Sequence, residues 1–222
     1  MTQKFIPILF STEMVNAILE GRKTQTRRVV KFDNYPPKLT HKHHSKKTVK
    51  GFEVYDGNNE LDGNLIFRHG NVGDILWVRE SFYTASNYNH WNPRLLINCN
   101  VEIFYKADIQ NSSIKQPLNR GKKRPSIHMP KEACRIFLKV TNVRVERLND
   151  ISRIDAIDEG VDFVHGVSTK IYYNYESLEF GCTPKESFLT LWKKINGNES
   201  LNSNPFVWVI EFEKIDKPQN FI

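Results

Sequence analysis

The segment Asn204-Pro-Phe-Val-Trp-Val-Ile-Glu-Phe212 constrains the fold more than any other part of the sequence. Large apolar residues recur there at every second position, which is the period of a β-strand: Phe206, Trp208, Ile210 and Phe212. Val207 and Val209 make the other face of the same strand apolar as well. Because a strand that is apolar on both faces must be covered on both, this segment is predicted to lie inside a layered fold.

A second β segment, residues 135–148, carries a change of face. Its apolar residues are Leu138 and Val140 in the first half, and Val143 and Val145 in the second half. The two pairs differ by one residue in parity, so their side chains would lie on opposite faces of a regular strand. A bulge or a sharp bend near Thr141-Asn142 is therefore expected, as at the corners of barrels.

Capping signals and apolar stripes predict about three helices. The first begins at Ser11 or Thr12 and ends before Gly21, and the second begins at Asp150 or Ser152 and ends at Gly160. A capping box, Thr183-Pro-Lys-Glu186, opens the third. With about six strands and no regular βαβ alternation, the pattern predicts the α+β class: a small mixed β-barrel with helices packed outside.

A chain of 222 residues fits one domain, 1–222, with insertions. Polar, loop-rich stretches place these insertions at about 31–63, 83–124 and 162–182. No apolar run approaches the roughly 20 residues of a membrane span. The three cysteines are far apart and form no C-x-x-C pair. We therefore expect a cytoplasmic protein that has no membrane association, no metal and no cofactor.

The net charge of +7 is unevenly distributed. Residues 22–50 hold ten of the 32 Lys and Arg but one of the 25 Asp and Glu, so this segment carries the whole positive excess. A smaller basic group is Arg120-Gly-Lys-Lys-Arg124. Such asymmetry favours an anionic partner, of which nucleic acid is the commonest. The alternative is a solvated loop in residues 31–50 that only keeps the protein in solution.

The densest group of chemically useful side chains is Gly21-Arg-Lys-Thr-Gln-Thr-Arg-Arg28, where the first helix stops and a strand starts. Arginine offers a planar fork that suits a phosphate or a base edge. Threonine offers a hydroxyl, and lysine offers a cation or, with a lowered pKa, a base. The alternative interpretation is an ordinary strand with its charges in solvent.

This segment resembles the G-x-K-x-x-E-x-R signature of the ASCH-domain family, which belongs to the PUA-like barrel superfamily. Gly21, Lys23, Thr26 and Arg28 stand in that frame. Threonine replaces the glutamate, as it does in the small bacterial acetylcytidine amidohydrolases of the same superfamily. Further blocks look like those of phage and prophage ASCH proteins: 73–80, 124–130, 143–152 and 204–212. The resemblance implies a PUA-like barrel.

In the amidohydrolases, the resemblance implies a catalytic lysine, threonine and glutamate. The first two correspond to Lys23 and Thr26, and the glutamate, in the helix after the long β segment, corresponds to Glu159. The reaction removes an acyl group from the exocyclic amine of cytidine, with Thr26 as nucleophile, Lys23 as base and Glu159 as proton shuttle. In a regular strand Lys23 and Thr26 point to opposite faces, so they converge only if the turn reorients Lys23.

Other side chains are candidates for ligand binding: Arg22, Arg27, Arg28, Arg79, Glu80, Ser126 and His128. Arg79 and Glu80 are consecutive in a strand, so their side chains point apart and cannot both line one pocket. We therefore favour a structural or pocket-rim pair over a catalytic role for these two residues. Ser126 and His128 resemble a Ser/His pair, but a histidine with a structural hydrogen bond is the alternative.

Two functions follow, and both use a cleft between the 21–28 turn and the 153–160 helix. The first is a PUA-like ASCH module that binds RNA or a (modified) nucleobase or nucleoside. The alternative is an amidohydrolase acting on N(4)-acetylcytidine-like substrates. A third hypothesis is an accessory protein whose insertions bind another protein, which the sequence does not identify.

Overall fold

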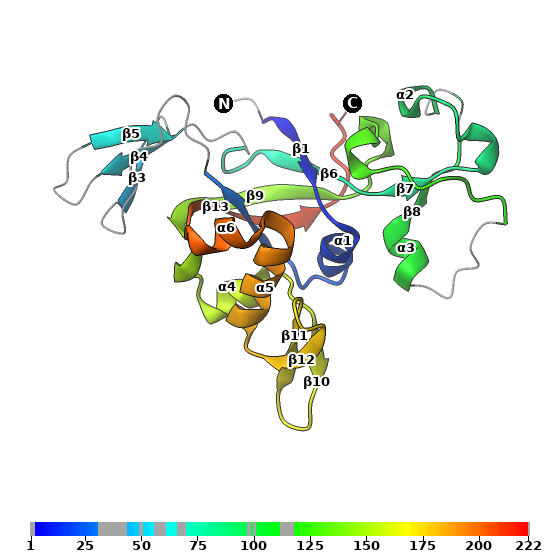
Figure 1. Ribbon diagram of the computed structural model, residues 1–222. Helices are drawn as coiled ribbons and strands as arrows, with labels where there is room; N and C mark the ends of the chain where they lie inside the picture. Colours follow the sequence, from blue (N-terminus) through cyan, green and yellow to red (C-terminus); the bar gives the residue numbers. More distant parts are fainter. Residues whose placement is uncertain are drawn as a thin grey trace. The chain divides into compact units, whose positions relative to one another are not determined.

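The computed structural model describes residues 3–30, 44–48, 51–55, 61–65, 70–96, 99, 101–111 and 118–221 (Figure 1). The chain divides into two compact units, each built from separate segments. Unit 1 comprises Met1–Gly21, Gly73–Val140 and Glu213–Ile222, and unit 2 comprises Arg22–Val72 and Thr141–Phe212.

Unit 1 contains a mixed set of strands. β1 (Phe5–Leu9) pairs in parallel with β6 (Ile75–Arg79), and β6 pairs antiparallel with the start of β9 (Phe137–Arg147). The remaining elements are α1 (Thr12–Leu19), β7 (Phe82–Tyr83), η1 (Ser86–Tyr88), α2 (Pro93–Leu96), β8 (Phe104–Tyr105), α3 (Lys106–Asn111), η3 (Ser126–His128) and η4 (Lys131–Ala133).

An aromatic cluster fills the core of unit 1. Phe221 packs edge-on against Phe5 and Phe137, with ring centroids 5.2 Å and 4.7 Å apart. Trp77 of β6 is tilted against the same ring at 6.1 Å. The two ends of the described chain and its middle therefore meet in one apolar core.

Unit 2 is built around β2 (Gln25–Val29), which pairs antiparallel with β13 (Phe206–Ile215). Its helices are α4 (Arg153–Asp158), α5 (Pro184–Asn196) and α6 (Asn198–Asn202), with η5 (Leu148–Asp150) before α4. Two three-stranded sheets belong to the same unit: β3 (His44–Thr48), β4 (Gly51–Tyr55) and β5 (Leu61–Leu65), and β10 (Phe163–His165), β11 (Lys170–Asn174) and β12 (Glu179–Cys182).

The prediction for the C-terminal strand is confirmed. Residues 206–210 of β13 are all buried, so both faces of this strand are covered. Phe188 and Trp192 of α5 belong to the same apolar cluster as Val207 and Val209. The capping box that opens α5 is also present, with Thr183 and Glu186 each accepting a backbone N–H of the other.

The face change in β9 lies where it was predicted. Leu138 and Val140 are buried, Thr141 is exposed, and Val143 is buried again. The Oδ1 atom of Asn142 accepts the N–H of Val143 at 2.9 Å. Because unit 1 ends at Val140 and unit 2 resumes at Thr141, the face change coincides with the passage between the units.

The α+β class is confirmed, but a closed barrel is not found within the described ranges. The principal sheet has the order β1-β6-β9-β13-β2, and its two edge strands, β1 and β2, do not pair with each other. The described residues also contain more elements than the three helices and six strands predicted, namely six α-helices and thirteen strands.

The predicted loop-rich insertions contain regular structure. Strands β10–β12 lie within or adjoin 162–182, and η1, α2, β8 and α3 lie within 83–124. Much of the 31–63 insertion, including 31–43, lies outside the described residues, while β3 and β4 fall within it. No described helix combines the length and the apolar character that a membrane span needs.

Candidate functional site

Near the start of unit 2, residues 23 and 24 are attached to α4 and β13 of the same unit. Gly21 adopts a left-handed conformation (φ 74°), which glycine tolerates and which ends the helix. Lys23 then forms an isolated antiparallel bridge with Glu159, at the end of α4. Thr24 donates its N–H to the Asp158 carbonyl at 2.9 Å and accepts the N–H of Phe212 at 2.8 Å. Main-chain hydrogen bonds therefore hold this segment in place independently of its side-chain contacts.

Lys23 and Glu159 form a buried ion pair. The Nζ atom donates to Oε2 of Glu159 at 2.8 Å and to the main-chain carbonyl of Glu159 at 2.9 Å. The two side chains are 0% and 4% exposed. Burial lowers the pKa of Lys23 below its usual 10.5, although the neighbouring carboxylate opposes this shift. The bonded pair spans the space between the 21–28 turn and the α4 end, where the sequence predicted a cleft.

Arg27 shares the same carboxylate. Its Nη1 donates to Oε1 of Glu159 at 2.9 Å, and its Nε donates to Oε1 of Glu146 at 3.1 Å. Its Nη2 also lies 3.8 Å from Oδ1 of Asp155. Glu159 thus has one oxygen on Lys23 and the other on Arg27, which fixes the orientation of its carboxylate.

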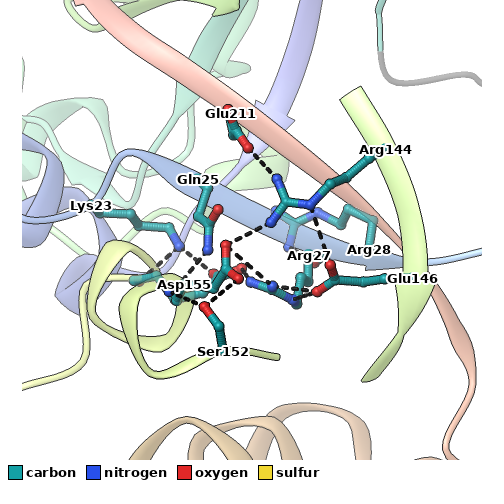
Figure 2. Close-up of polar contacts among 10 residues, drawn as sticks. Lys23, Gln25, Arg27, Arg28, Arg144, Glu146, Ser152, Asp155 and Glu211 are labelled. Atoms are coloured by element: carbon teal, nitrogen blue, oxygen red, sulfur yellow. Dashed lines mark hydrogen bonds and ion pairs between the residues drawn. The ribbon is translucent and has the colours of Figure 1, made fainter. Parts of the chain in front are cut away.

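Arg144 extends these contacts across the surface of β9. It donates to Asp155 at 2.6 Å, to Glu146 at 3.2 Å and also to Glu211. Figure 2 shows the Arg27 and Arg144 guanidinium groups on the same two carboxylates, with Ser152 beside Asp155. Burial raises the pKa of Asp155, but the hydrogen bond from Ser152 and the two guanidinium charges bring it below its ordinary value.

We call this group the ion network. It consists of four cations and four carboxylates: Lys23, Arg27, Arg28, Arg144, Glu146, Asp155, Glu159 and Glu211. Arg28 is half-buried, and burial lowers its pKa, while the charge of Glu159 opposes that shift. Because four cations stand against four carboxylates, the ion network is neutral as a whole.

Thr26 is buried but stands apart from this contact. It pairs with Ile210 across the β2–β13 ladder, between Gln25 and Arg27. Gln25 donates to the Asp155 carbonyl at 2.6 Å, on the side of α4 where Arg27 also bonds. Strand alternation puts Thr26 on the opposite face of β2. Among the described residues, no hydrogen bond joins its hydroxyl to Lys23 or Glu159. The structure therefore brings together two of the three catalytic candidates.

Arg22 braces the chain after α4. It donates to the Gly160 carbonyl at 2.9 Å and to Oδ1 of Asp162 at 3.4 Å, and its guanidinium lies 6.0 Å from the Phe163 ring. It thus contacts the peptide just beyond Glu159 and helps to position that residue.

The remaining candidates belong to unit 1. Glu80 is buried and accepts two hydrogen bonds from Arg135, at 2.8 Å and 3.0 Å. Burial raises the pKa of Glu80, against the influence of that guanidinium. Arg79 instead donates to the Ile127 carbonyl and lies over the Trp77 ring at 5.6 Å. Arg79 and Glu80 thus have separate partners and form no pair with each other.

Ser126 and His128 do not act as a pair either. Both lie in η3, where His128 is exposed, and the structure shows no hydrogen bond between their side chains in the described ranges. His128 lines a cleft of unit 1. No three His, Cys, Asp or Glu among the described residues are placed to hold a metal ion.

Sequence reasoning missed four members of the ion network: Arg144, Glu146, Asp155 and Glu211. Alternation along β9 could have placed Arg144 and Glu146 on one face. The chain matches no family model, no curated protein and no solved structure.

Proposed function

We propose that this chain is a PUA-like ASCH module that binds RNA or a (modified) nucleobase or nucleoside at the ion network. The observation that carries this proposal is the meeting of Lys23, Arg27 and Glu159 in one buried group at the 21–28 turn. The mixed sheet, with its parallel β1–β6 pair, supports the α+β class expected of such a module, although the sheet is open among the described residues.

Stability alone is a weak reason for such a network. Removing paired ions from water costs about as much as their attraction returns, so a buried ion pair adds little net stability. Ionisable groups with shifted pKa values gather instead at functional sites. The pKa values of Lys23 and Arg28 are both lowered by burial, which supports a functional role for the turn.

The chemistry of the network suits a nucleobase. A base edge presents hydrogen-bond donors and acceptors side by side, and single-stranded RNA is read on such edges. Here a guanidinium donor and a carboxylate acceptor lie side by side, because Arg27 donates directly to Glu159. Half-buried Arg28 lies at the edge of the same group and is the residue we expect a ligand to meet first.

The experiment is a binding titration of a labelled single-stranded RNA and of cytidine and acetylcytidine. We expect Arg28→Ala to weaken binding about tenfold or more, as expected for loss of a base contact. Lys214→Ala removes one exposed positive charge elsewhere and is the matched control. Binding should also weaken as salt is raised. A titration in which Arg28→Ala and the control behave alike would overturn the assignment of this site.

An amidohydrolase is the second candidate, and one observation favours it. A lysine that serves as a base near neutral pH needs a pKa far below 10.5, and burial moves the pKa of Lys23 in that direction. Glu159, at 2.8 Å, is within proton-transfer distance. The position of Thr26 on the opposite face of β2 weighs against Thr26 as the nucleophile, so we rank binding first.

The assay for this candidate is the incubation of acetylcytidine with the wild type and with Lys23→Ala, Thr26→Ala and Glu159→Ala. Release of acetate by the wild type, lost in all three variants, would support hydrolysis. Thr26→Ser retains the hydroxyl and should keep activity if Thr26 is the nucleophile. Absence of wild-type turnover would reject the enzyme.

A further inference from the structure

We propose that unit 1 carries a second nucleotide-binding site, the cleft between residues 89–93 and 122–128. It would take one nucleotide, free or within single-stranded RNA, with the base against the aromatic side chains and the phosphate against the lysines. This inference rests on the proposed function only for the class of ligand, because it uses none of the residues of the ion network.

The cleft has the size and lining that this ligand requires. Its volume is about 440 Å³, within the range of small-molecule sites. Its walls combine rings and cations: His90, Trp91, Lys122, Lys123, Arg124 and His128. Bases stack on aromatic side chains, and phosphates attract lysine and arginine, so both halves of a nucleotide find a matching wall.

The cations around this cleft lack acidic partners. In the described part of the chain, Lys122, Lys123 and Arg124 form no ion pair with a carboxylate. The same holds for Arg79 and Arg94. Burial, and then the charge of Arg94, lowers the pKa of Arg79. In the ion network, four carboxylates neutralise four cations. At the cleft, no carboxylate of the described residues neutralises the cations, so their charge is available to an anionic ligand.

The basic segment that lines the cleft is held in place rather than loose. Arg120 and Arg124 form isolated bridges with Ala85 and Phe82, and Gly121 donates its N–H to the Thr84 carbonyl at 2.8 Å. The Oδ1 atom of Asn89 accepts the N–H of Lys122 at 2.7 Å. Because the main chain of this segment is already fixed, less backbone entropy is lost when its lysines bind a phosphate.

The close contacts of the basic segment with Asn89 and Thr84 depend on the absence of a side chain at Gly121. A Cβ atom at that position would lie 2.2 Å from Oδ1 of Asn89 and 3.0 Å from the Thr84 carbonyl oxygen. A side chain there would displace Asn89 from its hydrogen bond with Lys122 and would crowd the Thr84 carbonyl.

Arg124 ties the aromatic wall to the basic wall. It is 5% exposed, and its guanidinium donates to the carbonyls of Trp91 and Tyr88. The Trp91 ring packs edge-on against Tyr88, with centroids 5.4 Å apart. The Nε atom of Arg124 is buried without a hydrogen-bond partner within the described structure. A buried donor in this state is costly, and a phosphate oxygen in the cleft would satisfy it.

The experiment measures the binding of free cytidine monophosphate and of a short labelled single-stranded RNA. The variants are Trp91→Ala, Trp91→Phe and the double change Lys122→Ala/Lys123→Ala. Lys214→Ala/Lys217→Ala removes the same charge from an exposed surface and is the control. We expect Trp91→Ala to weaken RNA binding roughly 5- to 150-fold, and Trp91→Phe to restore most of it. The cleft double variant should reduce the salt slope by about 1.4, and the control should not.

The outcomes distinguish the two kinds of ligand and the two sites. Loss of both ligands in the cleft variants supports a site for free nucleotides, and loss of RNA alone supports a site on the strand. If Arg28→Ala abolishes binding while the cleft variants bind like the control, the cleft inference is wrong and the proposed function stands. The reverse result supports the cleft and overturns the site at the ion network. Equal displacement of RNA by polyglutamate would show attraction by charge alone and overturn a nucleotide site. Thermal unfolding shows whether Trp91→Ala is folded, and the exposed lysine variants remain informative if it is not.

Discussion

Replacing Glu159 with glutamine tests whether Lys23 and Glu159 form a buried pair of charged side chains in the ion network. The change keeps the shape of the side chain and removes one of four negative charges. Lys23 would keep the main-chain carbonyl of residue 159 at 2.9 Å but lose a carboxylate at 2.8 Å. Arg27 would exchange the same carboxylate for a neutral amide oxygen. The buried group would carry one uncompensated positive charge.

The expected cost is large because both partners are buried. Removing one member of a buried ion pair costs about 3–5 kcal/mol of unfolding free energy. For a chain of this size, that amounts to a fall in melting temperature of about 6–20 °C. Glu213→Gln is the matched control, because Glu213 is more than half exposed and lies 3.5 Å from Lys139. Exposed pairs of that kind contribute about 0–1 kcal/mol.

The pH dependence gives a second reading of the same variant. The pKa of Lys23 is already lowered by burial, and losing the carboxylate lowers it further. Between the folded pKa and 10.5 the unfolded state binds more protons, so stability rises with pH across that window. The deficit of Glu159→Gln should therefore shrink as the pH rises from 7 towards 10.5, because a neutral lysine needs no counter-charge.

A double variant isolates the pair. Lys23→Met with Glu159→Gln removes one charge of each sign, leaves the network balanced and keeps an acceptor for Arg27. We expect it to be more stable than Glu159→Gln alone, with a coupling energy of about 0.5–3 kcal/mol. The assay is urea unfolding at two pH values of the wild type, the Glu213→Gln control, the two single variants Glu159→Gln and Lys23→Met, and the double variant. A cost below about 1 kcal/mol for Glu159→Gln, unchanged by pH, would refute the buried pair.

Three further predictions concern other parts of the chain. Thr183→Ala removes the N-cap of α5 and should cost about 1 kcal/mol, or roughly 2–4 °C in melting temperature, and Thr183→Ser should restore it. Cys99 is exposed, whereas burial raises the pKa of Cys134 to about 11, so a thiol reagent should modify Cys99 first. If the fastest phase of thiol modification persisted in Cys99→Ser, this order of reactivity would be contradicted. Gly121→Ala should cost about 1–3 kcal/mol, because its Cβ would crowd the Thr84 and Ala85 carbonyl oxygens and displace Asn89 from the N–H of Lys122. It should also weaken nucleotide binding without any loss of charge, and unchanged unfolding and binding would refute the close packing.

Local patterns predicted the elements well where one physical rule dominated. The double-faced strand around Trp208 and the face change at Thr141-Asn142 follow from side-chain alternation, and both are present. The capping box at Thr183 is equally local. These signals need no knowledge of distant residues, which is why a single sequence contains them.

Long-range contacts were harder to predict. Lys23 and Glu159, 136 residues apart, were joined by a family resemblance, because no spacing rule links them. The partners of Arg27 on β9 and α4 depend on how the strands assemble, which alternation alone does not specify. The basic residues 120–124 were expected in a loop because polar composition resembles a loop, although bridges to Phe82 and Ala85 order them.

The division of the chain into interleaved segments has a consequence for synthesis on the ribosome. Residues 1–21 belong to unit 1, yet the Phe221 ring on which Phe5 packs is synthesised about 200 residues after Phe5. Unit 2 has all its segments once residue 212 has emerged. The unit begun first is thus completed last, and β1 stays an unpaired apolar strand until residue 75 arrives. During that interval it is a natural substrate for chaperones that hold nascent chains.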